Sequence, residues 1–418
     1  MNDLTGQCIK RDQAHCWHPF TRQAEWCAPE HQPLVLVRGE GVWLWDSEDK
    51  RYLDGNSSIW TNIHGHAHPV INAAIREQLE KVAHTSFLGF THPLAAELAE
   101  RLCRFFPEHT LERVFFSDDG STAIECALKI AVQYRQQTGA PERNGFITFS
   151  NGYHGDTLGA ASLGGVGRFF ERFCGMGFPM LQVSSLDDLI ELDTSKIAAV
   201  VIEPLIQGVN EMRPWPMGML ANLRRWCDTN NLHLILDEVM TGFGRTGSMF
   251  ACQREDVIPD FLCLAKGLTG GYLPLAATLT TAKIYDAFLG HADHAFYYGH
   301  SYTANPLGCA AALASLDIFE NENTLAHLPE KIFHLSNRLA ELKAKHSVVY
   351  ETRQCGFIAG IELRGSNGKK FPTHERFGEM ICSTARQHGL LTRPILNTIV
   401  FMPPLVTSLM EIDYFFCE

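Results

Sequence analysis

LILDEVMTGFGRTG (residues 234–247) and, shortly after it, DFLCLAKGLTGG (residues 260–271) set the architecture of this chain. Each piece opens with an apolar run typical of a buried strand and then reaches a charge, at Asp237 in the first and at Lys266 in the second. A structural ion pair would explain an acid and an amine at two strand ends. A cofactor held from two sides would explain them as well.

Outward from this stretch, helical and apolar segments alternate from about residue 69. The alternation predicts βαβ units and therefore an α/β protein with a large domain built on a mostly parallel sheet. Ligands of such sheets bind beyond the carboxyl ends of the strands, where Asp237 and Lys266 would lie. The predicted helices are 69–83, 93–106, 121–139 and 220–231, and the predicted strands are 113–119, 145–152, 197–204, 233–238 and 260–267.

The two ends of the chain have a different pattern. Residues 34–55 alternate in polarity, which predicts an antiparallel meander with a turn near Asp49. After residue 320 a polar helix (roughly 323–346), two strand-like segments (348–364 and 390–405) and a helix (373–388) indicate a smaller α+β domain that the meander completes. We expect three parts: an N-terminal arm with part of the small domain (1–68), a large cofactor-binding domain (69–320) and a C-terminal small domain (321–418).

Composition excludes several classes of function. The 418 residues are 45% hydrophobic and 20% charged, with a net charge of −12, which argues against a nucleic-acid or anionic-membrane surface. The first twenty residues lack the apolar core of a signal peptide, and no apolar run reaches membrane-spanning length. The 13 cysteines include no C-x-x-C pair, so we expect reduced thiols in a cytoplasmic protein.

A third strand end, FFSDDGSTAIECALK (residues 115–129), predicts a phosphate site. Gly120 and Ser121 open the predicted helix, where free backbone N–H groups and the positive end of the dipole attract an anion. Ser121 as a simple N-cap is the alternative.

A phosphate site, a buried lysine and a buried aspartate are together what pyridoxal phosphate requires. Lys266 would form a Schiff base with its aldehyde, and Asp237 would pair with the pyridinium nitrogen. Tyr153 or His154, just past another strand end, could stack on the ring, although packing in the core or a loop explains Tyr153 equally well.

Two other motifs are similar to known ligand-binding patterns. GFGRTG (residues 242–247) fits a dinucleotide fingerprint, but no long helix follows it, so we expect its glycines to pass near the cofactor or a partner subunit, with Arg245 in a salt bridge or contacting substrate. His64, His66 and His68 suggest a metal, but no carboxylate or cysteine follows nearby, so we expect no metal site.

With these residues in hand, the chain resembles the class III, fold type I aminotransferases that use pyridoxal phosphate, and the resemblance covers nearly all of it. LILDEVMTGFGRTG followed by LAKGLTGG is similar to the specific signature of that class. HCWHPFT (15–21), GNSSIW (55–60), NGYHGDT (151–157) and YYGHSYTANPLGCAAA (297–312) resemble the branch that aminates 8-amino-7-oxononanoate in biotin biosynthesis.

The resemblance implies roles at individual positions. Lys266 would be the proton shuttle as well as the Schiff-base lysine, Asp237 the partner of the ring nitrogen, and Gly120 and Ser121 the phosphate cradle. His300 and Ser301 occupy the place where this family reaches the phosphate of the neighbouring subunit, which implies a homodimer with shared sites. The implied substrate contacts are Tyr153, Gly299, which would let the substrate pass, and Arg393, which would clamp its carboxylate.

The amino donor stays open between S-adenosylmethionine and lysine. This chain has Ile59 before Trp60 where the S-adenosylmethionine pattern has two tryptophans, and Phe20 where that pattern has a tyrosine. Another ω-aminotransferase, acting on ornithine, a diamine or β-alanine, and a cofactor-binding protein without turnover are the alternative functions. The chain is also short after Thr157 and after residue 405, so we expect a trimmed loop and no full C-terminal helix.

Overall fold

The computed structural model describes residues 3–178, 180–365 and 367–417. Its centre is a seven-stranded sheet in the order β4-β12-β11-β10-β7-β5-β6. Strands β11, β10, β7, β5 and β6 run parallel, while β12 lies antiparallel to both of its neighbours. The strands are β4 (Leu111–Ser117), β5 (Gly145–Phe149), β6 (Met180–Val183), β7 (Ile197–Ile202), β10 (His233–Asp237), β11 (Phe261–Leu264) and β12 (Ala276–Thr281).

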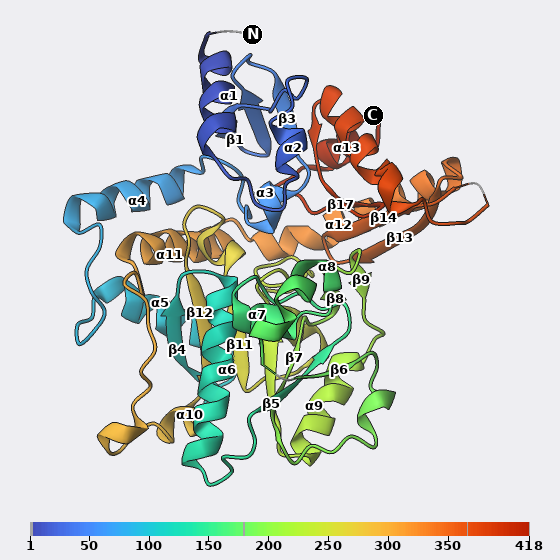
Figure 1. The fold of residues 1–418 in the computed structure, drawn as a ribbon. Coiled ribbons are helices and arrows are strands. Elements are labelled where there is room, and N and C mark those ends of the chain that lie inside the picture. The colour runs from blue at the N-terminus through green and yellow to red at the C-terminus, as the bar shows by residue number, and fades with distance from the viewer. Residues whose placement is uncertain (1–2, 179, 366, 418) are drawn as a thin grey trace.

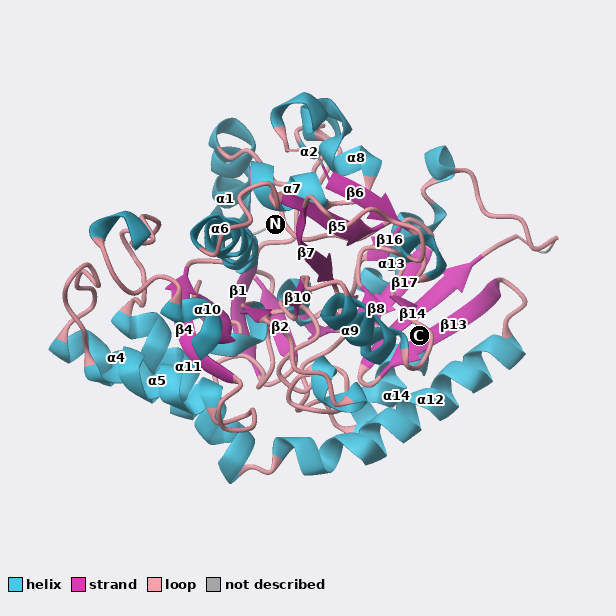
Figure 2. Ribbon diagram, turned by 90° about the horizontal axis from the view of Figure 1, so that it is seen from below, coloured by secondary structure: helices cyan, strands magenta, loops and turns pink. Residues whose placement is uncertain are grey.

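Helices cover both faces of this sheet, which explains why its central strands are apolar throughout. In β10, Leu234 and Leu236 pack into one core and Ile235 into another, as expected for a strand buried on both sides. Helix α6 crosses one face, and Figure 2 shows α4, α5 and α11 beside the β4 end. These helices are α4 (Pro69–Lys81), α5 (Pro93–Cys103), α6 (Gly120–Gln137), α7 (Leu158–Leu163), α8 (Gly167–Phe170), α9 (Met219–Thr229), α10 (Ala282–Asp286) and α11 (Pro306–Asn321).

The two chain ends lie side by side above the large sheet, coloured blue and red in Figure 1. The N-terminal meander forms as expected, with Asp49 in its turn at φ 65°. A strand from the C-terminal part, β15, pairs in parallel with β3 and completes a four-stranded sheet. The N-terminal elements are α1 (Asp3–His15), α2 (Gln23–Trp26), β1 (Leu36–Glu40), β2 (Trp43–Asp46), β3 (Arg51–Asp54) and α3 (Ser57–Trp60).

The C-terminal part forms a second four-stranded sheet, in the order β13-β14-β17-β16. A two-stranded sheet, β8 (Ile206–Gln207) with β9 (Arg213–Pro214), is formed by the segment between β7 and β10 of the large sheet. The C-terminal elements are α12 (Leu328–Lys345), β13 (Val349–Cys355), β14 (Ile358–Leu363), α13 (Phe377–Gln387), β15 (Leu390–Leu391), β16 (Pro394–Ile395), β17 (Thr398–Phe401) and α14 (Leu409–Cys417).

The expectation for the C-terminus needs correction, and two strands of the large sheet were missed. A nine-residue helix, α14, does form at the C-terminus, and it buries Ile412 and packs the ring of Phe415 against that of Phe401 at 4.2 Å. Strands β6 and β12 were not predicted, because β12 is a small-residue segment (AATLTT) without the branched apolar side chains typical of a strand.

Among the described helices, none is both long and apolar enough to cross a membrane. The division of the chain into three parts at residues 68 and 320 stays a prediction.

Candidate active site

A cavity of about 1000 Å³ opens beyond the carboxyl ends of β10 and β11. Asp237 closes β10, and Lys266 follows β11 by two residues on the adjacent parallel strand. Both side chains line the cavity, as does the start of α6. Ten of the residues singled out in the sequence therefore meet in one place: Phe20, Ile59, Trp60, Gly120, Ser121, Tyr153, His154, Asp237, Lys266 and Arg393.

Asp237 is fixed by two donors. His154 Nδ1 lies 2.7 Å from its Oδ2, and the Val239 backbone N–H donates to its Oδ1 at 3.1 Å. Burial alone would lower the pKa of His154, but the hydrogen bond and the charge of Asp237 raise it above its ordinary value. The raised pKa favours the protonated imidazole, which orients the carboxylate through this hydrogen bond. Sequence reasoning considered His154 only as a stacking ring.

Lys266 sits at a strained point of the backbone, with φ 45°, at the start of a 3₁₀ turn. Its Nζ lies 4.9 Å from the centre of the Trp60 ring. Burial lowers the pKa of this amine, and the charges of Asp237 and Glu203 oppose that shift. An amine with a lowered pKa is more often uncharged near neutral pH, and the uncharged form is the nucleophile and the base.

Glu203 is a site residue that sequence reasoning missed. It follows β7, is 5% exposed, and accepts the backbone N–H groups of Tyr153 at 3.1 Å and of Gly208 at 2.9 Å. Burial raises its pKa to about 7. It lines the cavity beside Asp237. Its position at the carboxyl end of a central strand, in IAAVVIEP, was the feature that could have found it.

Other parts of the chain pack closely against the N-terminus of α6 without covering the side that faces the cavity. Its N-cap is Asp119, whose side chain accepts the Thr122 N–H at 2.9 Å, so Ser121 is not the cap. A Cβ on Gly155, where φ is 123°, would come 2.2 Å from Ser121 Oγ, and a Cβ on Gly120 would come 2.6 Å from Val239 Cγ1. Glycine at both positions keeps the positive end of the helix open to the cavity.

The outer wall combines the N-terminal arm with aromatic rings. Phe20 packs edge-on against Phe169 at 5.5 Å, and Phe169 packs against Tyr153 at 5.8 Å. The Tyr153 hydroxyl donates to Asp156 at 2.5 Å. The ring wall is therefore continuous from the arm to the loop after β5.

A left-handed turn forms another part of the cavity wall, through Ile59 and Trp60. Ser57, Ser58, Ile59 and Trp60 all have φ between 46° and 68°, a conformation that costs energy for residues other than glycine. Asp54 stabilises it by accepting from the Ser58 N–H at 3.0 Å and hydroxyl at 2.9 Å. No glycine marks the turn, so the sequence did not predict it.

Gly299, His300 and Ser301 do not line this chain's cavity as far as the described residues show. They lie on the segment between α10 and α11, where Ser301 is exposed and His300 Nδ1 lies 3.4 Å from Asp118 Oδ2. Asp118 itself lines the cavity. Their roles, like those of the other predicted site residues, stay predictions.

The expectation for Arg245 in GFGRTG is wrong, whereas an approach of its glycines to a partner subunit stays a prediction. Arg245 is fully buried and its guanidinium donates to the backbone carbonyls of Pro403 and of Asn62, the latter at 2.8 Å. Burial lowers its pKa to about 9. A Cβ on Gly244 would come 2.6 Å from Leu405 Cδ1. The loop thus packs on the C-terminal segment, and Arg245 holds backbone rather than substrate.

The three alternating histidines point to separate partners instead of a common centre. Across the described part of the chain, no three His, Cys, Asp or Glu side chains gather as a metal ligand set. Burial lowers the pKa of His64 to about 3, so this imidazole is neutral. The partners are Ser315 for His64 at 2.9 Å, Asp54 for His66 at 3.0 Å and Glu322 for His68 at 3.2 Å.

Comparison with known proteins identifies the family. The model of the class III aminotransferases matches residues 26–417. The chain belongs to the class III aminotransferases. Their cofactor is pyridoxal phosphate, and the site fits it: a lysine with a lowered pKa, a fixed carboxylate and an open helix N-terminus line one cavity.

Relatives within the class III aminotransferases cover almost the whole chain. The adenosylmethionine-8-amino-7-oxononanoate aminotransferase of Geobacter sulfurreducens is 45% identical over 99% of this chain and 97% of its own length. The protein of the same name from Aquifex aeolicus is 43% identical over 97% and 94%.

Solved structures of aminotransferases are also similar to this chain over almost its whole length. The adenosylmethionine-8-amino-7-oxononanoate aminotransferase of Methanocaldococcus jannaschii superposes with a TM-score of 0.94 at 39% identity, over 98% of both chains. An amine transaminase from an uncultivated Pseudomonas species, in its PLP-bound form, gives 0.90 at 35% identity, over 96% of both. The fold type I architecture expected from the sequence is confirmed.

Proposed function

We propose that this enzyme transfers an amino group to 8-amino-7-oxononanoate, giving 7,8-diaminononanoate in biotin biosynthesis. The observation that carries the proposal is the 45% identity, over 99% of the chain, to a protein named for that reaction. The geometry supports it, because the substrate has a ketone near one end and a carboxylate at the other, and Lys266 and Arg393 both line the cavity.

Pyridoxal phosphate, when bound, supplies an aldehyde that combines with amines and a ring that accepts electrons. Gly120 and Ser121 would hold its phosphate, Asp237 its ring nitrogen and Lys266 its aldehyde carbon. Tyr153 and Phe20 would exclude water from the outer side. The Lys266 amine would then move the proton at the reacting carbon of donor and acceptor, since its lowered pKa keeps a share of it uncharged.

Arg393 would bind the carboxylate of the oxo acid by paired hydrogen bonds. It lies just before β16, at the edge of the hairpin that lines the cavity together with Pro394, Ile395 and Asn397. Ile59 and Trp60 would contact the donor, either S-adenosylmethionine, which the relatives' name indicates, or lysine, which a smaller residue at 59 would also admit.

A second function has specific support. The Pseudomonas structure and an (S)-enantioselective omega-transaminase from Thermomicrobium roseum are each 35% identical to this chain, with TM-scores of 0.90 and 0.91. An ω-aminotransferase acting on ornithine, a diamine or β-alanine is therefore the alternative. Its acceptor would not need Arg393 to bind a carboxylate at the end of a long chain.

The active assembly in this proposal is a homodimer in the cytoplasm. Ser301 and His300 would reach the phosphate of the neighbouring site, with Gly299 beside that site's substrate. The support is the exposure of Gly299 and Ser301 on a segment that does not line this chain's own cavity among the described residues.

Separate half-reactions test the function. The enzyme loaded with pyridoxal phosphate is mixed with S-adenosylmethionine or with lysine alone, and the cofactor absorbance is followed. We expect one donor to bleach it and 8-amino-7-oxononanoate to be aminated in the second half. Bleaching by ornithine or β-alanine, with no product from the oxononanoate, would establish the alternative instead.

A further inference from the structure

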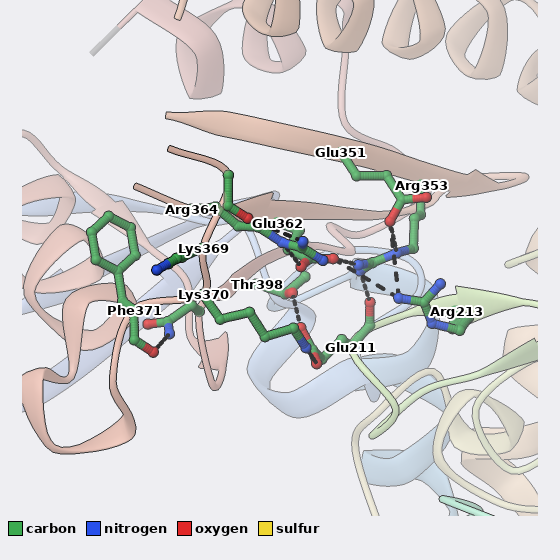
Figure 3. A network of polar contacts seen from close by, with 12 residues as sticks. Glu211, Arg213, Glu351, Arg353, Glu362, Arg364, Lys369, Lys370, Phe371 and Thr398 are labelled. Carbon is green, nitrogen blue, oxygen red and sulfur yellow. Dashed lines mark hydrogen bonds and ion pairs between the residues drawn. The ribbon is translucent and has the colours of Figure 1, made fainter. Parts of the chain in front are cut away.

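A charge network joins the loop after β8 (residues 208–212) to the C-terminal sheet β13-β14-β17-β16, called the small sheet from here on (Figure 3). Its centre is Glu362 on β14, 1% exposed, which pairs with Arg353 on β13 and with Arg364 at 2.7 Å. Glu351 and Arg213 extend it toward the surface. Removing one member of a buried ionic network leaves unpaired charge, so the network fixes where its parts sit.

Glu211 is the residue through which this network reaches the loop. It has φ 56°, and its backbone carbonyl accepts from Arg353 Nη1 at 2.6 Å. Its carboxylate accepts from the Thr398 hydroxyl at 2.8 Å and from Lys370 Nζ at 3.1 Å. Burial raises its pKa, but these donors bring it below its ordinary value, so Glu211 stays charged.

The backbones of the loop and the small sheet come into close contact at this point. A Cβ on Gly360 of β14 would lie 2.9 Å from Met212 Cβ and 3.1 Å from the Glu211 carbonyl oxygen. The contact therefore depends on a glycine in the middle of a strand. Glu211 takes a strained conformation within it.

Thr398 connects Glu211 to the cavity wall. It is 0% exposed and pairs with Ile395 across the β16–β17 hairpin. Arg393 precedes that hairpin, and its carbonyl accepts from the Val400 N–H at 3.3 Å. A shift of Thr398 would therefore move the hairpin and Arg393 with it.

The other end of the same loop is tied to the cofactor side of the cavity. The Gly208 N–H donates to Glu203, and Gly208 in turn accepts from the Met212 N–H at 3.1 Å. Between them Val209 lines the cavity. Residues 208–212 thus bridge the carboxyl end of β7 and the hairpin of Arg393.

We infer that Glu211 is a positioning residue: through Thr398 it sets the distance between Arg393 and Lys266, and so selects the chain length of the carboxylate-bearing acceptor. The inference rests on the proposed function, in which Arg393 binds that carboxylate. A network that served stability alone would have no effect on which acceptor is used.

The test compares four variants of the holoenzyme. Glu211→Gln removes the charge and Thr398→Val removes the hydroxyl at nearly constant volume. Thr398→Ser keeps the hydroxyl, and Glu351→Gln alters the exposed side of the same network. KM and kcat are measured for 8-amino-7-oxononanoate and for the donor, and Tm for each variant.

We expect E211Q and T398V to raise KM for the oxo acid on the order of tenfold, as for a misplaced binding group, with kcat and the donor KM nearly unchanged. Both variants should also reduce the preference for this acceptor over homologues one methylene longer or shorter. T398S and E351Q should behave like wild type, and the double variant E211Q/T398V should be no worse than either single one. Equal effects on acceptor and donor, or an equal effect of E351Q, would overturn the inference.

Binding of nonanoate, which has the carboxylate and chain but no reacting carbonyl, separates the two proposals. It is measured by calorimetry on the holoenzyme, with Arg393→Ala as reference. We expect E211Q to weaken nonanoate binding on the order of tenfold, the same factor by which KM for the oxo acid should rise. If wild type binds nonanoate but does not aminate the oxononanoate, the proposed function fails and the positioning role is still tested. Unchanged nonanoate binding in E211Q would refute the role itself.

Discussion

Glu203 ties the electrostatics of the site together at the scale of single residues. It is a buried carboxyl whose pKa lies at about 7, and its charge raises the pKa of the Lys266 amine, which burial lowers. Below about pH 7 Glu203 is protonated and exerts no such effect. The share of uncharged Lys266 is thereby coupled to the ionisation of Glu203 near neutral pH.

Glu203→Gln should therefore lower the pKa of Lys266. The uncharged share of Lys266 should differ between variant and wild type only above pH 7, where Glu203 is charged in the wild type. The measurement is the pH dependence of the rate at which an acylating reagent modifies Lys266 in the cofactor-free protein. We expect the variant to react faster than wild type at pH 8 and equally at pH 6. Identical profiles across that range would show that Glu203 does not act on the lysine.

Some of these residues were accessible from sequence and others were not. Asp237 and Lys266 stand out because a charge ends an apolar run. Glu203 follows the same rule and could have been found. Arg245 was misjudged because its partners, the carbonyls of Asn62 and Pro403, are distant in sequence. The left-handed turn at 57–60 has no local marker, since Asp54 stabilises residues that do not favour it.

At the scale of elements, the start of α6 depends on Gly155. Gly155→Ala places a Cβ in a left-handed backbone and 2.2 Å from Ser121 Oγ. We expect the affinity for pyridoxal phosphate to fall by at least roughly tenfold, because the helix start and the loop must separate. Dissociation constants from equilibrium dialysis would show it.

Gly139→Ala is the matched control for that change. Gly139 also has a left-handed φ, 85°, but a Cβ there meets nothing within 4 Å. It should lower Tm through backbone strain and leave cofactor affinity intact. An equal loss of affinity in both variants would mean that strain, not the approach to Ser121, is what matters.

Helix α14 should stabilise the small sheet more than its nine residues suggest. Phe415→Ala removes a ring that is 8% exposed and packed on Phe401, and we expect a loss of about 3–5 kcal/mol in the free energy of unfolding. Met410, 81% exposed on the same helix, gives the control, since M410A should change it by less than about 0.5 kcal/mol. Denaturant unfolding measures both, and a small effect of F415A would show that α14 does not cover the core.

For the whole molecule, the order of β4, β5, β7, β10 and β11 and of the helices between them followed from the alternation of apolar and helical segments, because the central strands are buried on both faces. The pairing of β15 with β3 could not be predicted in this way, since it joins segments more than 300 residues apart and β15 has only two residues. The sequence patterns that predict single elements contain no information about such pairings.

Assembly can be tested with two variants that fail for different reasons. Lys266→Ala should abolish transamination, and Ser301→Glu should repel the phosphate of the neighbouring site. If sites are shared, a co-expressed mixed dimer contains one site with an intact lysine and an intact Ser301, and activity returns. Mixed dimers as inactive as their parents would place Ser301 outside the neighbouring site.

The central claim is that Lys266 holds the cofactor at the carboxyl end of β11. Borohydride treatment of the holoenzyme, followed by peptide mass mapping, tests it most directly. We predict that the mass of the reduced cofactor appears on Lys266, and that K266A binds pyridoxal phosphate without acquiring it. A label on another lysine, or none on the wild-type protein, would contradict the account.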